Sequence, residues 1–427
     1  MKILYVSQYF PPEMGAPAAR AVELARHWVH AGHDVTVLTG FPNHPTGVVP
    51  EEWRPRLHNL VYREDVDGIQ VVRTWLLPLP NRKAHERMLN YGSFCVSAAW
   101  RGMEISRPDV VIATSPQLLV GLAGWWIAFW KRVPFIFEVR DLWPESLSAV
   151  GVGTENSLLH RGLGKIAGFL YGAADQIVVV TPAFKDHLTR HWTIPAGKIS
   201  IVENGVESSL FSPDAADPVL RERLGLKRKF VAAYIGTMGM AHGLDTLIEA
   251  ASLLRQRDPD ISFLLVGEGA DKQRIQAIVR ERELPNIHFV DQQPREKIPA
   301  FVGASDVCLV LLKKTDLFKT VIPTKMLEFM SCAKPVILGV DGQARQIVEG
   351  ARAGPVIEPE NANALVDAIQ RLKADASACR TFGQSARAYI VEHYSREQTA
   401  GQYVGVLNDV LGKQGESPWR RTARDST

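Results

Sequence analysis

Short apolar runs alternate with stretches of helical period in the first half of the chain. The runs predict buried strands at residues 3–6, 35–38, 110–113, 135–138 and 176–180. Between the first two runs, Ala18, Val22, Ala25 and Val29 recur at helical spacing, and Gly32 is a good stop for that helix. This order of strand, helix and strand predicts a parallel sheet with helices on both faces.

The same alternation begins again after Asn204-Gly205. It predicts strands at 230–235, 262–266, 287–290, 307–312 and 335–338, with helices at 244–254, 271–283 and 324–332. Ser208, Ser209, Pro213 and Pro218 favour a linker at 206–218. A helical stretch over 376–411 closes the chain.

The expected fold class is therefore α/β, with two Rossmann-like, doubly wound parallel-sheet domains facing a cleft. We expect the first domain at 1–205 and the second at 206–385. A C-terminal helix at 386–412 should pack back towards the first domain, and residues 413–427 should form a polar tail. Ligands of such sheets bind beyond the carboxyl ends of the strands.

Composition narrows the class without naming a function. Of the 427 residues 46% are hydrophobic and 22% charged, which is ordinary for a globular protein, and a net charge of +3 is too weak to argue for nucleic acid. Four scattered cysteines favour a reduced, cytoplasmic chain. We expect no signal peptide, and the most apolar stretch, 118–130, is shorter than the roughly 20 residues of a membrane span.

The segment Ile322-Pro323-Thr324-Lys325, with Glu328 one turn later, lies between a predicted strand and a predicted helix. Thr324 is an acceptable N-cap, and the N–H groups of a first helical turn suit a diphosphate. Lys325 adds a positive charge, and the Glu328 carboxylate suits the vicinal hydroxyls of a ribose. The alternative is a capping box with a lysine on a solvated face.

Glycines follow two of the predicted strands and precede helices. Gly236-Thr237 follows strand 230–235, and Gly15 lies in the first loop of the chain. Each lets backbone approach a phosphate, although a tight turn accounts for them equally well.

A charged cluster, Arg140-Asp141 with Glu138 and Glu145, comes directly after the strand at 135–138. Charges at the end of a buried strand are costly unless they are paired. They predict either a structural ion pair or contact with a polar ligand, and the crowding of carboxylates favours the ligand.

With these motifs assembled, the sequence resembles the retaining glycosyltransferase family 4, which has the GT-B fold. Gly236, Gly243, Lys325, Glu328 and the 203–206 junction carry the resemblance. Residues 140–145 and 41–47 are similar to a narrower branch of bacterial O-antigen and capsule transferases, including those of the N-acetyl-L-fucosaminyltransferase type.

The resemblance implies roles residue by residue. Glu328 would bind the ribose, while Lys325 and the backbone of Ile322, Pro323 and Thr324 would hold the diphosphate of a UDP-sugar. The remaining implied donor contacts are Gly15, Gly236, Thr237, Gln292 and Gln293. The resemblance implies catalysis by Arg140, Asp141 and Lys325, and no metal or cofactor. It also implies that the leaving phosphate accepts the proton of the acceptor, so that no base from the protein is needed.

Four positions of the candidate site depart from the family pattern. Arg140 stands where a histidine is common, and an arginine cannot act as a general base. Thr237 and His242 replace a basic pair, so phosphate charge must be met elsewhere. Thr320 replaces one of two paired glutamates, for which Asp316 is a candidate substitute.

We expect the residues that bind the acceptor to lie in the first half of the chain. Asn43, His44 and Glu145 are candidate acceptor contacts. Aromatic and basic residues mix at 75–79, 81–83, 100–101 and 125–132, which favours a face on the cytoplasmic side of the inner membrane that reaches a polyprenyl-diphosphate-linked sugar. A buried helix with a solvated basic rim is the alternative.

Three functions remain open. The leading hypothesis is transfer of a sugar, N-acetyl-L-fucosamine or another N-acetylated hexosamine, to a lipid-linked glycan in surface polysaccharide synthesis. The others are a nucleotide-sugar epimerase or hydrolase, and a non-catalytic sugar-nucleotide-binding subunit.

Overall fold

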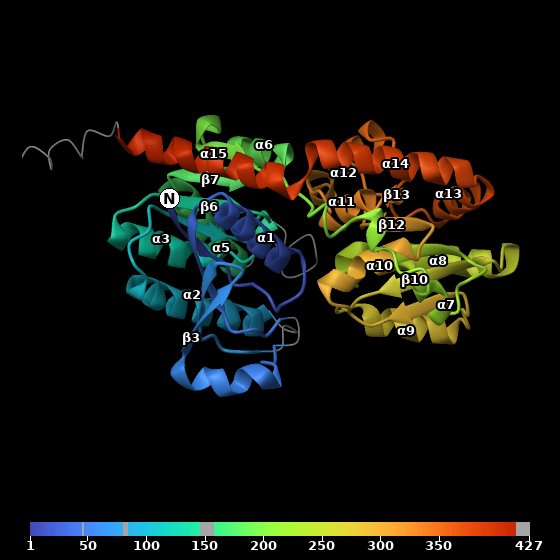
Figure 1. Cartoon of the computed structure of the whole chain (residues 1–427), viewed down its shortest axis with the longest axis horizontal. Helices are drawn as coiled ribbons and strands as arrows, with labels where there is room; N and C mark the ends of the chain where they lie inside the picture. The colour runs from blue at the N-terminus through green and yellow to red at the C-terminus, as the bar shows by residue number, and fades with distance from the viewer. Residues whose placement is uncertain (45–46, 80–83, 146–157, 416–427) are drawn as a thin grey trace, which may run out of the picture. The chain divides into compact units, whose positions relative to one another are not determined.

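The computed structural model describes residues 1–44, 47–79, 84–145 and 158–415. The chain forms two compact units, one of Met1–Glu203 with Thr399–Thr427 and one of Asn204–Gln398 (Figure 1). Two segments that the sequence singled out, Pro45-Thr46 and the basic run 81–83, lie outside the described residues.

Unit 1 is built on an eight-stranded sheet of described strands, in the order β3-β4-β2-β1-β5-β6-β7-β8. The strands are β1 (Lys2–Val6), β2 (Asp34–Gly40), β3 (Val61–Val66), β4 (Ile69–Thr74), β5 (Val110–Thr114), β6 (Phe135–Val139), β7 (Gln176–Val179) and β8 (Ile199–Ile201). The helices are α1 (Ala16–His30), α2 (Ala84–Glu104), α3 (Val120–Lys131), α5 (Leu158–Ala173), α6 (Pro182–His191) and α15 (Arg396–Gly415), which begins in unit 2. All described pairings are parallel except that of β3 with β4.

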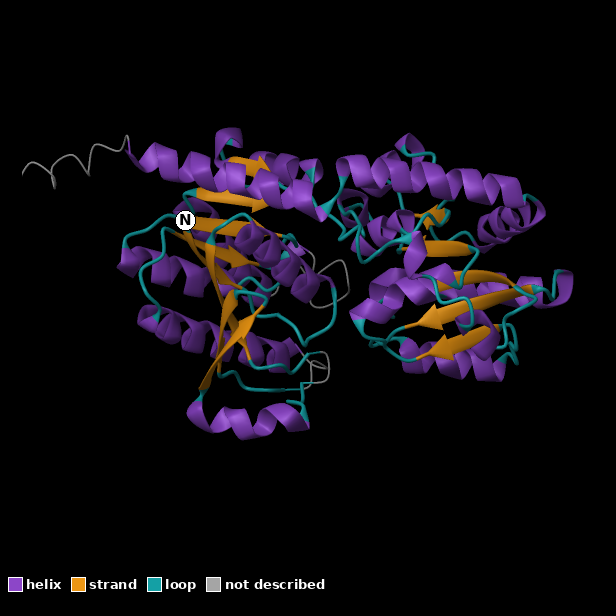
Figure 2. Cartoon of the chain, in the orientation of Figure 1, coloured by secondary structure: helices purple, strands orange, loops and turns teal. Residues whose placement is uncertain are grey.

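Alternate residues of these strands face different helices. Tyr5, Val37 and Ile112 belong to one apolar cluster with residues of α1 and α15. On the other face, a Cβ added to Gly124 of α3 would meet the Cβ of Ala113 at 2.6 Å, so helix and strand lie in close contact. Figure 2 shows the strands enclosed by helices, which confirms the predicted doubly wound arrangement for unit 1.

Unit 2 repeats the pattern with a five-stranded parallel sheet in the order β11-β10-β9-β12-β13. The strands are β9 (Phe230–Ile235), β10 (Ile261–Val266), β11 (Ile287–Val290), β12 (Val307–Leu311) and β13 (Val336–Gly339). The helices are α7 (Leu220–Arg223), α8 (Asp245–Arg257), α9 (Lys272–Glu281), α10 (Ile298–Gly303), α11 (Thr324–Ser331), α12 (Gln343–Gly350), α13 (Ala362–Ala374) and α14 (Ala376–His393). The five strands predicted for this half, and the helices predicted at 244–254, 271–283 and 324–332, are present with bounds that differ by at most three residues.

The predicted helical stretch at 376–411 is wrong in one respect, because it is two helices. The backbone of Val206 interrupts it: the Val206 N–H donates to Tyr394 O at 2.9 Å, and the Arg396 N–H donates to Val206 O at 2.9 Å. The chain therefore leaves helical geometry at Tyr394-Ser395 to form a parallel bridge. After this break, Tyr403 and Leu407 of α15 are buried in the unit 1 cluster with Trp28.

The sequence analysis missed the antiparallel hairpin of β3 and β4. Strand β3 lies at the edge of the sheet and carries Arg63, Glu64 and Asp65, so its apolar alternation is weak. Its two-residue turn, Asp67-Gly68, has positive φ at both positions (55° and 80°), as a primed hairpin turn requires. The Asp-Gly pair is the sequence feature from which this hairpin could have been predicted.

Candidate functional site

The lysine of the first turn of α11 lies inside unit 2, against the loop after β9. Lys325 Nζ is 3.8 Å from the ring centroid of Tyr234. A Cβ added to Gly236 would lie 3.5 Å from Lys325 Cδ and 3.6 Å from Nζ. The structure thus brings together two predicted donor residues, Gly236 and Lys325, at the carboxyl end of β9.

This ammonium group is buried and makes no hydrogen bond to the described part of the chain. Burial lowers the pKa of Lys325 to about 7, although the charge of Glu328 opposes the shift. Its contact with the Tyr234 face replaces little of the hydration that an ammonium loses. A cation held in this way is poised for an anion that the chain itself does not supply.

The histidine of this loop is not a second cation. Burial and the nearby Lys325 lower the pKa of His242 to about 3, so the ring is neutral at ordinary pH. Thr237 is exposed and its carbonyl accepts a hydrogen bond from Tyr234 Oη at 2.6 Å. Positive charge at the Gly236 loop therefore comes from Lys325.

Glycines let two loops pack backbone against backbone beside this lysine. Gly267 has φ +142°, and a Cβ there would lie 2.1 Å from Gly236 O. Gly269 has φ +157°, and a Cβ there would lie 2.3 Å from Met238 O. No other residue fits either position. The Gly236 loop is thus held in place by the loop after β10.

Glu328 is 8% exposed and forms an ion pair that the sequence analysis missed. Arg295 Nη1 donates to Glu328 Oε1 at 2.7 Å, and the guanidinium of Arg295 lies 4.8 Å from the ring centroid of Phe211. Arg295 follows Gln292 and Gln293 in the loop after β11, and Gln293 Nε2 donates to Asp291 O at 3.1 Å. The ion pair ties this predicted base-binding loop to the predicted ribose-binding carboxylate.

The expected N-cap of α11 is wrong. Pro323 occupies that position with φ −63° and ψ 119°, Thr324 is the first helical residue, and no side chain of the described residues caps the helix. Proline fits this position because its ring fixes φ near the observed value and it has no N–H that would need an acceptor. The first N–H groups of a helix have no intrahelical acceptor, so they remain suited to a ligand oxygen. Ile322, just before them, is 5% exposed.

Thr320 and Asp316, the residues at the position expected to orient the sugar, make local contacts within unit 2. Thr320 Oγ1 donates to Leu317 O at 2.6 Å, and exposed Asp316 pairs with Lys319 at 2.6 Å. Asp316 and Lys319 therefore neutralise each other on the surface of unit 2.

In unit 1, Gly15 is the N-cap of α1 with φ 122°, a conformation that favours glycine. Arg140, after β6, lies next to this helix start: its Nη2 is 3.4 Å from Ala16 O. The backbone N–H of Arg140 donates to Ser115 Oγ at 2.7 Å. Its Nε and Nη1 are buried without a hydrogen-bond partner in the described chain. Gly15 and Arg140 are therefore brought together.

The ion pair beside them is between Glu138 and Arg20, not between Arg140 and Asp141. Arg20 Nη2 and Nε donate to Glu138 Oε1 at 2.8 and 3.1 Å, and Tyr5 Oη donates to Oε2 at 2.9 Å. Glu138 is fully buried. Burial alone would raise the pKa of Glu138, but the charges of Arg20 and Arg140 hold it below its ordinary value.

Asp141 and Glu145, the two other carboxyl groups of this loop, have pKa values shifted in opposite directions. Burial raises the pKa of Asp141 to about 6, opposed by the charge of Arg140. Glu145 Oε1 lies 3.2 Å from His187 Nε2 and accepts from Trp192 Nε1 at 3.3 Å. Burial would raise the pKa of Glu145, yet these contacts keep it below its usual value. Of the two, Asp141 is the carboxyl group that can exchange a proton near neutral pH.

A buried carboxylate that the sequence analysis missed supports the loop of Asn43 and His44. Glu13 Oε1 accepts the backbone N–H groups of both residues at 2.9 Å. Burial raises the pKa of Glu13 to about 7, against the lowering effect of these hydrogen bonds. Asn43 is buried, and its Oδ1 accepts from Asn90 Nδ2 at 3.1 Å. The ring of His44 packs edge-on to Tyr9 at a centroid distance of 5.0 Å.

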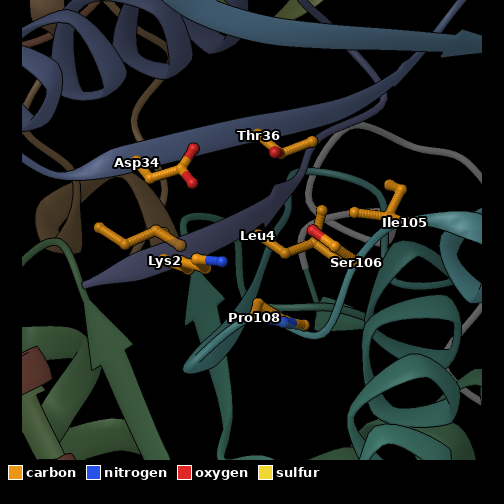
Figure 3. A pocket seen from close by; sticks show the side chains of 8 residues that line it. Lys2, Leu4, Asp34, Thr36, Ile105, Ser106 and Pro108 are labelled. Atoms are coloured by element: carbon orange, nitrogen blue, oxygen red, sulfur yellow. The ribbon is translucent and has the colours of Figure 1, made fainter.

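A small pocket of unit 1 lies elsewhere. Figure 3 shows it between Lys2, Asp34 and Pro108, at the amino ends of β1 and β2. Ligands of parallel sheets bind at the opposite, carboxyl ends. Within residues 1–44, 47–79, 84–145 and 158–415, no group of His, Cys, Asp or Glu is placed to hold a metal ion, and no helix is long and apolar enough to cross a membrane.

Each half of the chain matches a known family model. Residues 15–205 match "Glycosyl transferase 4-like domain", and residues 217–389 match "Glycosyl transferases group 1". The chain carries both domains, and it is a glycosyltransferase with the GT-B fold. The predicted enzyme class and fold class are thereby confirmed.

Relatives cover nearly the whole chain. It is 25% identical over 431 residues to the glycosyl transferase WcaI of Escherichia coli (strain K12), whose name assigns it to colanic acid biosynthesis, with 96% of this chain and 100% of the relative covered. Sucrose-phosphate synthase from Thermosynechococcus elongatus is similar in structure, with a TM-score of 0.75 at 21% identity, over 96% and 99% of the two chains. Anabaena HepE in complex with UDP-glucose has a TM-score of 0.71 at 17% identity, over 96% and 100%.

Proposed function

We propose that the chain is a retaining glycosyltransferase that takes its sugar from a UDP-sugar bound to unit 2. The observation that carries this proposal is the buried, unpartnered ammonium of Lys325 at the start of α11. An ammonium without a counter-ion is costly inside a protein, and a diphosphate would supply the missing charge and hydrogen bonds.

The neighbouring residues fit the rest of a nucleoside diphosphate. The N–H groups at Thr324 and Lys325 would bind phosphate oxygens together with the backbone at Gly236. Glu328, held by Arg295, would accept hydrogen bonds from the ribose hydroxyls with its second carboxylate oxygen. Gln292 and Gln293 would meet the base. The likeness to HepE, solved with UDP-glucose, supports this class of donor.

The proposed transfer breaks the bond between the sugar C1 and the phosphate oxygen and forms a bond from C1 to the acceptor oxygen on the same face. The acceptor proton passes to the leaving UDP, so no base from the protein is needed. Charge develops on the leaving diphosphate, and a preorganised cation there stabilises the transition state. Lys325 fills that role, which makes an arginine at position 140 compatible with the reaction.

In unit 1, the two unpartnered nitrogens of Arg140 and the start of α1 at Gly15 support a second anion-binding position. We assign Arg140 to the departing phosphate or to an acceptor phosphate. We assign Asp141 to a sugar hydroxyl. A half-buried carboxyl group with a raised pKa can accept a hydrogen bond from that hydroxyl or donate one to it. Asn43, His44 and Glu145 are assigned to the acceptor.

The proposed acceptor is a polyprenyl-diphosphate-linked glycan at the cytoplasmic face of the inner membrane, in the synthesis of a bacterial surface polysaccharide such as O-antigen or capsule. The relative named for colanic acid biosynthesis supports this class of product. The proposed sugar is N-acetyl-L-fucosamine or another N-acetylated hexosamine, which rests on the similarity of residues 41–47 and 140–145 to that branch.

The test is transfer of labelled sugar from a panel of UDP-sugars to a polyprenyl-diphosphate glycan, with product anomers assigned by NMR. We expect transfer with retention from one UDP-N-acetylhexosamine, and no transfer by Lys325→Met. Inversion would contradict the mechanism. Tight UDP binding without transfer to any acceptor would contradict the function.

The same assay separates the alternative enzyme class. An epimerase or hydrolase would turn over the UDP-sugar in the absence of acceptor, and Asp141 is the carboxyl group whose pKa, about 6, suits a proton carrier for it. Turnover without acceptor that is lost in Asp141→Asn would favour that class over transfer.

A further inference from the structure

Helix α2 carries an apolar stripe that points away from the protein. Leu89, Val96, Trp100 and Met103 fall on one side of the helix at 100° per residue. Val96 is 74% exposed and Trp100 is 72% exposed. The side chains of Phe94 and Ala98, on the opposite side, are buried. The helix therefore has an inner apolar face that is covered and an outer apolar face that is not.

Helix α3 repeats this arrangement beside it. Trp126, Phe129 and Trp130 occupy adjacent turns and are 41%, 60% and 56% exposed. Trp125 stacks on Phe129 and meets Phe169 of α5 at a centroid distance of 4.9 Å. The exposed aromatic residues thus continue from one helix to the next.

The fold of unit 1 does not need these large side chains. The inner side of α3 includes two glycines in close contact with the sheet, since a Cβ at Gly121 would meet Phe137 at 2.9 Å and one at Gly124 would meet Ala113 at 2.6 Å. Small residues thus face the sheet, while tryptophan and phenylalanine face outwards. We call the outer surface the aromatic face and define it by Val96, Trp100, Trp126, Phe129, Trp130 and Phe169. A contiguous exposed apolar surface of this kind marks a docking site.

The charges beside the aromatic face are basic. Helix α3, Arg132 after it and helix α5 together contain four basic residues, Lys131, Arg132, Arg161 and Lys165, and no aspartate or glutamate. Lys131 Nζ donates to the carbonyls of Met103 and Ile105 at 3.1 and 2.6 Å, so this basic end lies against the end of the α2 stripe. Glu104, at that end of α2, is paired with Arg101 at 2.7 Å.

We propose that the aromatic face docks on the surface of a membrane that contains anionic lipid. Tryptophan side chains with basic neighbours suit the boundary between acyl chains and headgroups, where the rings are buried and the cations meet phosphate. A second copy of the chain fits less well, because a two-fold contact through this face would set one basic rim against another.

The docking contact lies wholly in unit 1 and requires no donor at Lys325. It deepens the proposed function by supplying the surface from which a lipid-linked acceptor is reached. Vesicle binding measures neither UDP affinity nor transfer, so a negative result for docking leaves the proposed reaction standing.

The experiment is flotation of the full-length chain with vesicles of equal parts phosphatidylglycerol and phosphatidylethanolamine, and with vesicles of phosphatidylcholine alone. The variant is Trp100→Ser/Phe129→Ser/Trp130→Ser. The matched control is Val219→Ser/Val391→Ser, which removes exposed apolar side chains from unit 2. Circular dichroism and thermal unfolding, measured on every variant, report that both units are folded.

We expect the wild type and the control to float with the anionic vesicles, and the partition coefficient of the triple variant to be at least tenfold lower. Raising the salt concentration, or the change Arg161→Glu/Lys165→Glu, should also lower it. Equal flotation of the wild type and the triple variant would overturn the proposal. So would a concentration-dependent dimer that the triple variant abolishes, which would identify a second copy as the occupant.

Discussion

The buried charges of the two units differ in how they are neutralised. In unit 1, Glu138 is fully buried and both its oxygens are occupied, one by Arg20 and the other by Tyr5. In unit 2, the ammonium of Lys325 is buried, lies over the ring of Tyr234 and makes no hydrogen bond to the described residues. A charge that is paired within the chain holds the fold together, whereas a buried charge left without a partner marks the place of a ligand.

Each unit also offers an example of the other kind. Glu328 of unit 2 is paired with Arg295, while Arg140 of unit 1 has two buried nitrogens without a described partner. The Lys325 ammonium lies at the start of helix α11, and Arg140, with its two unpartnered nitrogens, lies after β6 and next to the start of helix α1. This comparison predicts opposite outcomes when a paired charge and an unpartnered one are removed.

The largest effect is expected from Arg20→Met. Removing Arg20 leaves the Glu138 carboxylate buried without its counter-ion, so the free energy of unfolding should fall by about 3–5 kcal/mol. Urea denaturation followed by circular dichroism measures it. The double variant Arg20→Met/Glu138→Leu should recover most of the loss. Unchanged stability in Arg20→Met, or no recovery in the double variant, would contradict the claim that the paired charge of unit 1 holds the fold together.

Lys325→Met should lower the activity but not the stability, in contrast to Arg20→Met. We expect kcat/KM for transfer to fall by about 10²–10³ because the cation at the leaving diphosphate is lost. The free energy of unfolding should stay the same or rise, since no hydrogen bond is removed and burial of the charge is relieved.

The matched control is Lys334→Met in the same unit. Lys334 Nζ donates to the carbonyls of Gly303 and Ser305 at 2.9 and 2.7 Å, so it is a partnered lysine. Its removal should cost stability by about 1–3 kcal/mol and leave the transfer rate of the folded enzyme unchanged. The account fails if Lys325→Met is destabilised like Lys334→Met and transfers sugar normally.

The local parts of this comparison could be predicted from the sequence. Strands such as Phe230–Ile235 and Val307–Leu311 are unbroken apolar runs, and Gly236 and Lys325 are phosphate-binding candidates from the sequence alone. Parallel strands place their following loops at one edge of a sheet, so the proximity of Gly236 and Lys325 follows from the order of elements.

The pairing of the charges could not be predicted in the same way. Arg20 and Glu138 are 118 residues apart, and Arg295 and Glu328 are 33 apart, so only the packed fold decides which charges meet. Arg20 did carry one signal, because it lies within the apolar run Ala18–Val22, where an arginine must find a buried partner. The interpretation of the Arg140-Asp141 cluster, as either an ion pair or a ligand contact, did not take Arg20 into account as a partner for Glu138.

Glu328→Gln sharpens the comparison at the paired carboxylate of unit 2. The change removes the charge that should bind the ribose, so the affinity for UDP should fall by about tenfold or more, as expected for hydrogen bonds to a charged group. The affinity for 2′,3′-dideoxy-UDP, which lacks both hydroxyls, should not change. Isothermal titration with both nucleotides measures this. An equal loss of affinity for the two nucleotides would show that Glu328 does not bind the ribose hydroxyls.

The smallest expected effect is the uptake of a proton on donor binding. With its pKa near 7 in the free chain, Lys325 is mostly neutral at pH 8, and a bound diphosphate favours the charged form. Because unbound Lys325 loses its proton as pH rises through its lowered pKa, the affinity for UDP should weaken above about pH 7.

Calorimetry at pH 8 in two buffers of different ionisation enthalpy measures that uptake. The wild type should take up about one proton per UDP, as the lowered pKa requires, and Lys325→Met should take up none. The same uptake in both proteins would assign the proton to another group.

The most direct test of the central claim compares UDP with uridine in titrations of the wild type and Lys325→Met. If the unpartnered ammonium is the diphosphate anchor, the variant should bind UDP at least tenfold more weakly, as loss of a charge-assisted contact predicts, and bind uridine as the wild type does. Undiminished affinity for UDP in a folded Lys325→Met chain would contradict the claim.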